Sequence, residues 1–174
     1  MTSLTKICLH WTGGANIPCE QNLNCYHFLF DKNGKEYKGK YKPEDNLNCT
    51  DGIYAKHCGG GNTGCIGVSC CGMYGFNLQA KKTKYPLTQK QVEAMCAKVA
   101  KLCTAYGIPV TNKTVFTHYE FGQTHPNTTS ATKIDFTYLP YLPNLAKDRV
   151  GDYLRNKIQW YILPVSYTHL RAHE

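Results

Sequence analysis

The stretch TGCIGVSCCGMYG, Thr63–Gly75, is apolar and interrupted by glycines. This composition is typical of a central strand against which another part of the chain packs closely. Downstream, Thr88 and Gln91 form a capping box that predicts a helix start, and Gly107 is a helix-stop signal. Between these signals, apolar residues recur at helical spacing: Val92, Met95, Cys96, Val99, Leu102, Cys103 and Tyr106. A buried strand followed by an amphipathic helix indicates an α/β protein.

Further strand-like and helix-like segments lie on both sides of this pair. KICLHW (6–11) and TVFTH (114–118) are short apolar strands, and YHFLFDKNGKEYKGKY (26–41) is a hairpin that turns at its Asn-Gly dipeptide. RVGDYLRNKIQWYI (149–162) has the apolar spacing of a closing helix. We expect an α/β fold with a single mixed central β-sheet flanked by helices, in one domain that covers residues 1–163.

The C-terminal segment PVSYTHLRAHE, residues 164–174, has neither helical nor strand periodicity. It resembles the translated reading frame of a transposon-end adaptor used in preparing sequencing libraries. We interpret it as a non-native, adaptor-encoded tail and expect it to contribute nothing to fold or activity. His169 and His173 are therefore not candidates for a functional site.

Composition and charge narrow the class of partner. The chain has 174 residues and a mean hydropathy of −0.44, and no apolar run approaches the roughly 20 residues that span a bilayer. We therefore expect no membrane insertion, and the N-terminal sequence shows no signal peptide. The net charge of +8 favours a polyanion, such as the anionic polymers of a bacterial envelope. No nucleic-acid-binding motif accompanies the charge, so we do not expect a nucleic acid.

The ten cysteines contain no C-x-x-C pair, which excludes the common zinc-ribbon and redox signatures. Cys96 and Cys103 fall on the apolar face of the predicted helix, where core packing accounts for them. Five others lie in sequence that looks like loops: Cys19, Cys25, Cys49, Cys58 and Cys65. These five could form disulfides in an oxidising medium or remain reduced thiols, and the sequence leaves both states open.

Two histidines and an aspartate form a candidate metal site. His10 and His118 each end a predicted strand, and the triplet Lys133–Asp135 follows the polar loop expected after His118. Two imidazoles and a carboxylate are a sufficient ligand set for catalytic zinc, which keeps its fourth position for water. The alternative is a pair of hydrogen-bonded strand-end histidines, because no HExxH-like motif supports the site. His125 is a second alternative, as a ligand in place of His118.

Six segments together resemble the zinc-dependent N-acetylmuramoyl-L-alanine amidases. This family includes phage lysozyme-type amidases, bacterial muropeptide amidases and animal peptidoglycan recognition proteins. The segments occur in the family's order, and the resemblance extends to about Leu163: ICLHWTGG, YHFLFDKNG, YAKHCGGGNTGCIGVSCCG, PLTQKQVEAMCAKVAKLC, VFTHYEFG and KID. The last helix, GDYLRNKIQWYI, also looks like that of phage-borne members.

The resemblance implies a role for several residues. The three Zn²⁺ ligands that it implies are His10, His118 and Asp135. It implies catalytic roles for Tyr26 and Lys133, and it places His57 and Asn62 in the segment that lines the substrate groove. This chain departs from the family in its long spacer between His118 and Lys133, and in Phe136, where relatives often carry proline.

The function that the resemblance implies is hydrolysis of peptidoglycan at the amide between N-acetylmuramic acid and L-alanine of the stem peptide. The expected protein is a monomeric phage endolysin, made in the host bacterial cytoplasm without a signal peptide and acting on the cell wall after release. A non-catalytic peptidoglycan-binding module and a cell-wall recycling amidase are the alternatives. Because recognition proteins that lost zinc typically lack a ligand, the presence of all three ligand residues favours an enzyme.

Overall fold

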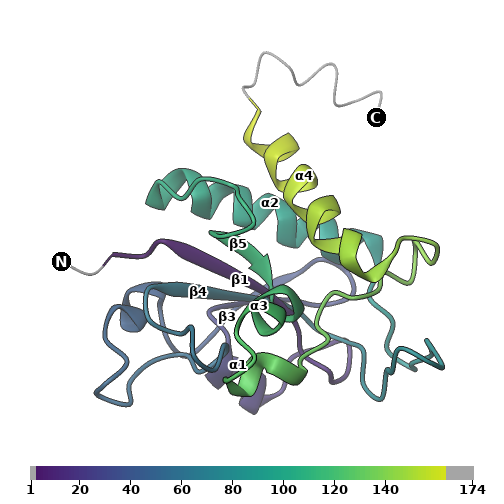
Figure 1. Ribbon diagram of the computed structural model, residues 1–174, viewed down its shortest axis with the longest axis horizontal. Coiled ribbons are helices and arrows are strands. Elements are labelled where there is room, and N and C mark those ends of the chain that lie inside the picture. The colour runs from purple at the N-terminus through teal and green to yellow at the C-terminus, as the bar shows by residue number, and fades with distance from the viewer. Residues whose placement is uncertain (1–2, 164–174) are drawn as a thin grey trace.

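A five-stranded mixed sheet forms the centre of the computed structural model, which describes residues 3–163 (Figure 1). The adaptor-like tail, residues 164–174, lies outside the described residues. The strand order is β3-β2-β4-β1-β5. The strands are β1 (Lys6–Trp11), β2 (Phe28–Phe30), β3 (Glu36–Lys38), β4 (Cys65–Cys70) and β5 (Val115–Thr117). β2 and β3 form the predicted antiparallel hairpin, and every other neighbouring pair is parallel. The prediction of one mixed sheet is confirmed, with β4 as the middle strand.

The two faces of the sheet have different side chains, as the alternation of strand residues requires. On β1, Ile7, Leu9 and Trp11 belong to the main hydrophobic core, whereas Cys8 belongs to a smaller cluster. His10 alternates with them and shares the face of Cys8. The same alternation divides β4. One face of the sheet therefore forms the main apolar core, and the other carries His10 beside a smaller cluster that includes Cys8, Cys65 and Phe116.

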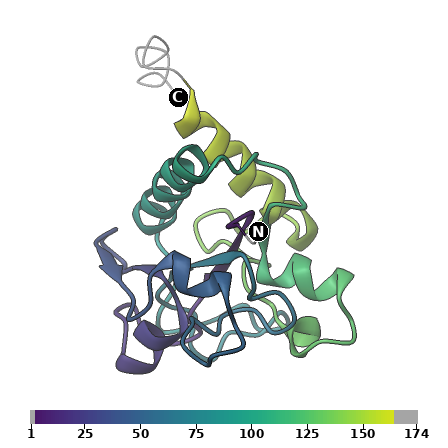
Figure 2. The ribbon, with the colours of Figure 1, turned by 90° about the vertical axis from the view of Figure 1, so that its left-hand side faces the viewer.

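Helices α2 (Gln89–Tyr106) and α4 (Val150–Ile162) cover the apolar face (Figures 1 and 2). The predicted caps of α2 are confirmed. The side-chain oxygen of Thr88 accepts a hydrogen bond from the backbone N–H of Gln91 at 3.2 Å, and Gly107 has the left-handed φ of 66° that a helix stop requires.

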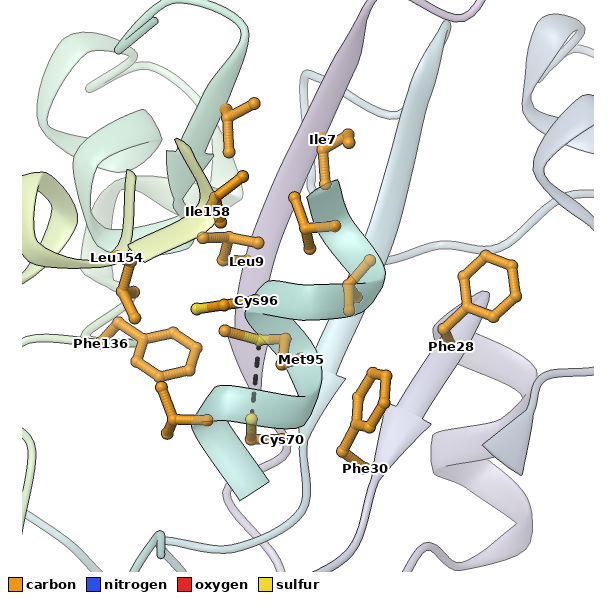
Figure 3. Packing of buried hydrophobic residues seen from close by; sticks show 14 of the residues in the cluster. Ile7, Leu9, Phe28, Phe30, Cys70, Met95, Cys96, Phe136, Leu154 and Ile158 are labelled. Atoms are coloured by element: carbon orange, nitrogen blue, oxygen red, sulfur yellow. Dashed lines mark hydrogen bonds between the residues drawn. The ribbon is translucent and has the colours of Figure 1, made fainter. Parts of the chain in front are cut away.

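The main core lies between these two helices and the sheet. Leu154 and Ile158 of α4 are buried at its centre, as the apolar spacing of the closing helix predicts (Figure 3). Cys70 of β4 contacts Met95 of α2, with 3.6 Å between the two sulfur atoms (Figure 3). Cys96 is also buried there, which agrees with its interpretation as a core residue.

Short elements cover the other face: α1 (Glu20–Cys25), the 3-10 turns η1 (Pro43–Leu47) and η2 (Thr129–Thr132), and α3 (His118–Thr124). A third 3-10 turn, η3 (Lys147–Arg149), precedes α4. The expectation of a polar loop directly after His118 is wrong, because His118 is the first residue of α3. Thr117 and Glu120 form a reciprocal capping box that starts this helix.

All ten cysteines are free thiols in this structure. Two of the five assigned to loop-like sequence lie in regular elements: Cys25 ends α1, and Cys65 is the buried first residue of β4. Cys58 is also buried. Among residues 3–163, no helix is long and apolar enough to cross a membrane.

Candidate functional site

The three proposed ligands meet on the polar face of the sheet. His10 lies near the carboxyl end of β1, and His118 directly follows β5, the parallel neighbour of β1. Asp135 Oδ2 lies 3.2 Å from His10 Nδ1 and 3.6 Å from His118 Nδ1. All three residues are buried, with exposed fractions of 0%, 4% and 7% for His10, His118 and Asp135. The structure therefore brings together side chains that are far apart in the sequence.

The hydrogen bonds of His118 determine which of its nitrogens faces Asp135. Its Nε2 lies 2.9 Å from the hydroxyl oxygen of Ser130. That hydroxyl donates its single proton to the carbonyl oxygen of Gly59 at 2.7 Å, so its oxygen accepts from His118. His118 therefore carries a proton on Nε2 and, in its neutral form, directs a lone pair on Nδ1 toward Asp135.

His10 is oriented in the same way through His57. His57 Nε2 lies 3.0 Å from the carbonyl oxygen of Cys65, which can only accept, so this nitrogen is the donor. His57 Nδ1 must then accept from His10 Nε2, which lies 2.9 Å away. The neutral tautomer of His10 consequently directs its Nδ1 lone pair toward Asp135 as well.

The Nδ1 lone pairs of His10 and His118 thus both face the Asp135 carboxylate, with no proton between them. Such an arrangement of acceptor atoms needs a cation at its centre. Burial disfavours the charged form of His118, but the Asp135 carboxylate and the Cys58 thiol raise the pKa of His118 to about 9. Burial also opposes the ionisation of Asp135, but the neighbouring imidazoles of His10 and His118 hold its pKa well below its usual range. Protonation of His118 supplies one such cation, and a divalent metal ion can take the place of that proton. Two imidazoles and one carboxylate suit Zn²⁺ with one position left open.

Donor atoms of Cys8, His10 and His57 form a second close group, all within 4.8 Å of one another. The hydrogen bond between His10 and His57 already uses two of these atoms. The group that contains Asp135 is therefore the better candidate for a metal centre.

A cavity of about 540 Å³ lies over the metal centre, and Tyr26, Lys133, Asp135 and His118 line it. The ring centroid of Tyr26 lies 5.0 Å from that of His10. Burial and the negative charge of Asp135 raise the pKa of the Tyr26 hydroxyl well above its usual value, so it remains a protonated donor. Lys133 is exposed at the same cavity. The structure brings together all five residues that the sequence assigned to metal binding and catalysis.

A larger cavity, of about 620 Å³, lies beside β5 and α3, where Phe116 and Phe121 line it. None of the three converging ligands lines this cavity. His125 does line it, stacked on Phe121 with ring centroids 3.8 Å apart. His125 is thus outside the metal centre, and the alternative that it replaces His118 as a ligand is wrong.

His57 and Asn62 line the cavity of about 540 Å³, but both ring nitrogens of His57 and the side-chain oxygen of Asn62 are already engaged. Both ring nitrogens of His57 are hydrogen-bonded, and its exposed fraction is 6%. Asn62 Oδ1 accepts from the backbone N–H groups of His57 at 3.0 Å and Cys58 at 2.8 Å. These contacts give His57 a role in orienting His10 and give Asn62 a role in holding the loop. A direct role in substrate binding stays a prediction.

Gly67 of β4 makes room for the ring of His57. A Cβ atom at Gly67 would lie 2.5 Å from His57 Cγ and 2.8 Å from Nδ1, which is too close for any side chain. The sequence predicted that another part of the chain packs closely on the glycines of the Thr63–Gly75 stretch, but it did not identify His57 as the group that packs on Gly67. It also missed Ser130, which lies in a polar stretch without a distinguishing motif.

A partly buried ion pair holds the start of α3. Arg155 of α4 donates to Glu120 through two parallel hydrogen bonds of 2.8 Å, and its NH1 group also donates to the carbonyl oxygen of Val115 at 3.0 Å. Glu120 Oε1 accepts the backbone N–H of Thr117 at 2.9 Å. His118 therefore lies between two segments that α4 fixes in place. We call this group of contacts the Arg155–Glu120 clamp.

The backbone conformation of Phe136, directly after Asp135, accounts for the absence of the proline that relatives often carry there. It is fully buried and has a φ of 64°. Proline fixes φ near −65°, so it cannot occupy this backbone conformation. The chain after Asp135 thus follows a course that is incompatible with the proline common in relatives.

Comparisons with known proteins give one match that covers most of the chain. The sequence profile of the family described as N-acetylmuramoyl-L-alanine amidase matches residues 2–133, ending just before Asp135. No curated protein matches the chain.

Similar solved structures share little sequence with this chain. N-acetylmuramoyl-L-alanine amidase LysC from Clostridium intestinale URNW has 19% identity over 68% of this chain and 72% of that chain, with a TM-score of 0.47. Drosophila peptidoglycan recognition protein SD has 16% identity over 74% of this chain and 76% of that chain, with a TM-score of 0.48. PlyL has 19% identity over 68% and 70%, with a TM-score of 0.40.

Proposed function

Because the chain belongs to the N-acetylmuramoyl-L-alanine amidase family, we propose that it is a zinc-dependent enzyme that cleaves peptidoglycan between N-acetylmuramic acid and L-alanine. One observation carries the zinc dependence: two imidazole lone pairs and a carboxylate converge within 3.6 Å, in orientations fixed by hydrogen bonds on their far sides. The cavity above them contains the protonated donors that an amide hydrolase needs.

His10, His118 and Asp135 would hold the ion. When bound, Zn²⁺ polarises a carbonyl group and lowers the pKa of water, which supplies a nucleophile near neutral pH. Lys133 and Tyr26 donate hydrogen bonds to the carbonyl oxygen as negative charge develops on it. Burial raises the pKa of Tyr26, so its protonated hydroxyl is available as a hydrogen-bond donor. His57 and Ser130 keep the two imidazoles in the tautomer that the centre requires.

We further propose that the protein is a phage endolysin, made in the host cytoplasm and acting on the cell wall after release. The resemblance of the closing helix to phage-borne members supports this origin, and the net charge of +8 suits a wall that contains anionic polymers. A recycling amidase would share the chemistry but act on soluble fragments. A non-catalytic binding module is disfavoured, because all three ligand residues are present.

The test is mass spectrometry of purified peptidoglycan after digestion, combined with metal analysis of the protein. We expect one zinc ion per chain and products with a free lactyl carboxyl group and a free L-alanine amino group. His118→Ala removes one ligand, so it should lose both the metal and the cleavage. Equal zinc content in the wild type and His118→Ala would contradict the ligand assignment, and cleavage at any other bond would contradict the reaction.

A further inference from the structure

The catalytic cavity contains two ammonium groups and no free carboxylate. Lys56 and Lys133 line it, and the one acidic residue in its lining, Asp135, is engaged by His10 and His118. Within residues 3–163, no carboxylate lies within 4.0 Å of either lysine ammonium. The proposed mechanism assigns Lys133 to the scissile carbonyl group. Lys56 has no assigned function.

The backbone on both sides of Lys56 is fixed by buried side chains. Asn46, which is fully buried, accepts the N–H of Ala55 at 2.9 Å and donates to its carbonyl oxygen at 3.0 Å. On the other side, the N–H of His57 donates to Asn62 at 3.0 Å. Lys56 therefore extends from a rigid part of the loop, although its own side chain is exposed.

An aromatic ring holds the tip of Lys56 at the edge of the cavity. Its ammonium nitrogen lies 5.5 Å from the centroid of the Tyr54 ring, and Tyr54 lines the same cavity. A cation over an aromatic ring is favoured but keeps its N–H groups free for another partner. The geometry therefore presents an anchored cation to whatever occupies the cavity.

We propose that Lys56 binds the α-carboxylate of the second stem-peptide residue, so that the protein prefers stems in which this carboxyl group is free. The inference rests on the proposed function. The second residue is a D-glutamate linked through its γ-carboxyl group, which leaves its α-carboxyl group either ionised or amidated. This carboxylate lies about two residues, or roughly 7 Å, beyond the scissile bond. It is the first anionic group that a bound stem peptide offers after the carbonyl group held by Lys133.

Two synthetic muramyl dipeptides test the proposal. Both carry a methylamide on the γ-carboxyl group, and they differ only in the α-carboxyl group, which is free in one and amidated in the other. The wild type should cleave the free acid with a kcat/KM about three- to fivefold higher, the size expected for a partly exposed ion pair. The difference should appear in KM, because the contact is the same in the ground and transition states.

Variants of Lys56 separate this contact from the general positive charge. Lys56→Met should abolish the preference, Lys56→Arg should retain it, and Lys56→Glu should reverse it. Lys101→Met, on the exposed side of α2, removes the same charge outside the cavity and should leave the preference unchanged. Higher salt should weaken the preference of the wild type.

The outcomes distinguish this inference from the proposed function. Cleavage of both dipeptides by the wild type at equal kcat/KM would overturn the inference and leave the amidase proposal intact. A preference that survives in Lys56→Met would also overturn it. Cleavage of neither the dipeptides nor purified peptidoglycan at the muramyl–alanine bond would overturn the proposed function, and the role of Lys56 with it.

Discussion

His57 determines which nitrogen of His10 faces the metal centre, although it is not itself a ligand. Its Nδ1 accepts the His10 proton because its Nε2 is committed to a backbone carbonyl group. The ring packs against Gly67, where no side chain fits. Outer partners of this kind typically change metal affinity by about 10- to 100-fold when they are lost.

Gly67→Ala should therefore weaken zinc binding by about 10- to 100-fold without changing any ligand, because the added Cβ displaces the ring of His57. His57→Ala should have the same effect. Chelator competition at equilibrium measures the affinity. Gly14→Ala is the matched control, since its nearest neighbour would be 3.6 Å away, an ordinary contact. Wild-type affinity in both Gly67→Ala and His57→Ala would exclude the orienting role.

At this scale, the sequence predicted the residues that meet at the candidate site but not those that orient them. His10 and His118 stood out because each follows an apolar strand, and Asp135 and Lys133 because they form a short motif. Ser130 has no such mark. Ser130 orients His118 because its one hydroxyl proton is donated to the carbonyl oxygen of Gly59, which leaves its oxygen to accept from His118. Only the folded structure shows these contacts.

The Arg155–Glu120 clamp shows how helices on opposite faces of the sheet are coupled. Arg155 has an exposed fraction of 9%, and it links α4 to the first turn of α3. Gly151 belongs to the same contact, since a Cβ there would lie 2.4 Å from Glu120. The closing helix therefore contributes to the position of His118 as well as to the core.

Arg155→Met should destabilise the protein by about 2 kcal/mol, a value between those for exposed and fully buried ion pairs, because it leaves the Glu120 carboxylate without its partner. Glu120→Gln should cost less, since glutamine can still complete the capping box. The double variant should be more stable than the sum of the two single effects predicts. Urea unfolding measures all three, and strictly additive effects would show that the two side chains are not coupled.

Long helices were predictable from sequence, and short helices were not. The apolar spacing of α2 extends over several turns, and both of its caps are explicit in the sequence. α1 and α3 have six and seven residues, too few to show a clear helical period. The capping pair Thr117 and Glu120 was the available signal for α3.

At the scale of the whole molecule, the protein should lose stability in mild acid, because it buries His27 in its neutral form. Burial lowers the pKa of His27 from its ordinary value of 6.5 to about 4. Between these two values the unfolded chain binds a proton that the folded protein does not, so the free energy of unfolding falls as the pH falls. Above pH 6.5 this contribution is complete and constant.

Substitution of His27 by a group that does not titrate isolates this effect. His27→Gln should be less stable than the wild type at neutral pH. The difference between the two proteins should then shrink by up to about 3 kcal/mol from pH 6.5 to pH 4, as the wild type alone loses its contribution. Urea unfolding across this range provides the measurement. A difference that does not change with pH would show that His27 is charged in the folded state.

The strand order has a consequence for the time at which the proposed metal site is complete. β1 is synthesised first, but its neighbours in the sheet are β4 and β5. It therefore remains unpaired until residues 65–70 and 115–117 have been synthesised. Contacts between such distant segments form late, and an unpaired apolar strand is prone to aggregation in the meantime. A ribosome-bound chain that ends before Asp135 contains His10 and His118 but lacks the carboxylate that completes the set. The proposed metal site can therefore be completed only after Asp135 has been synthesised.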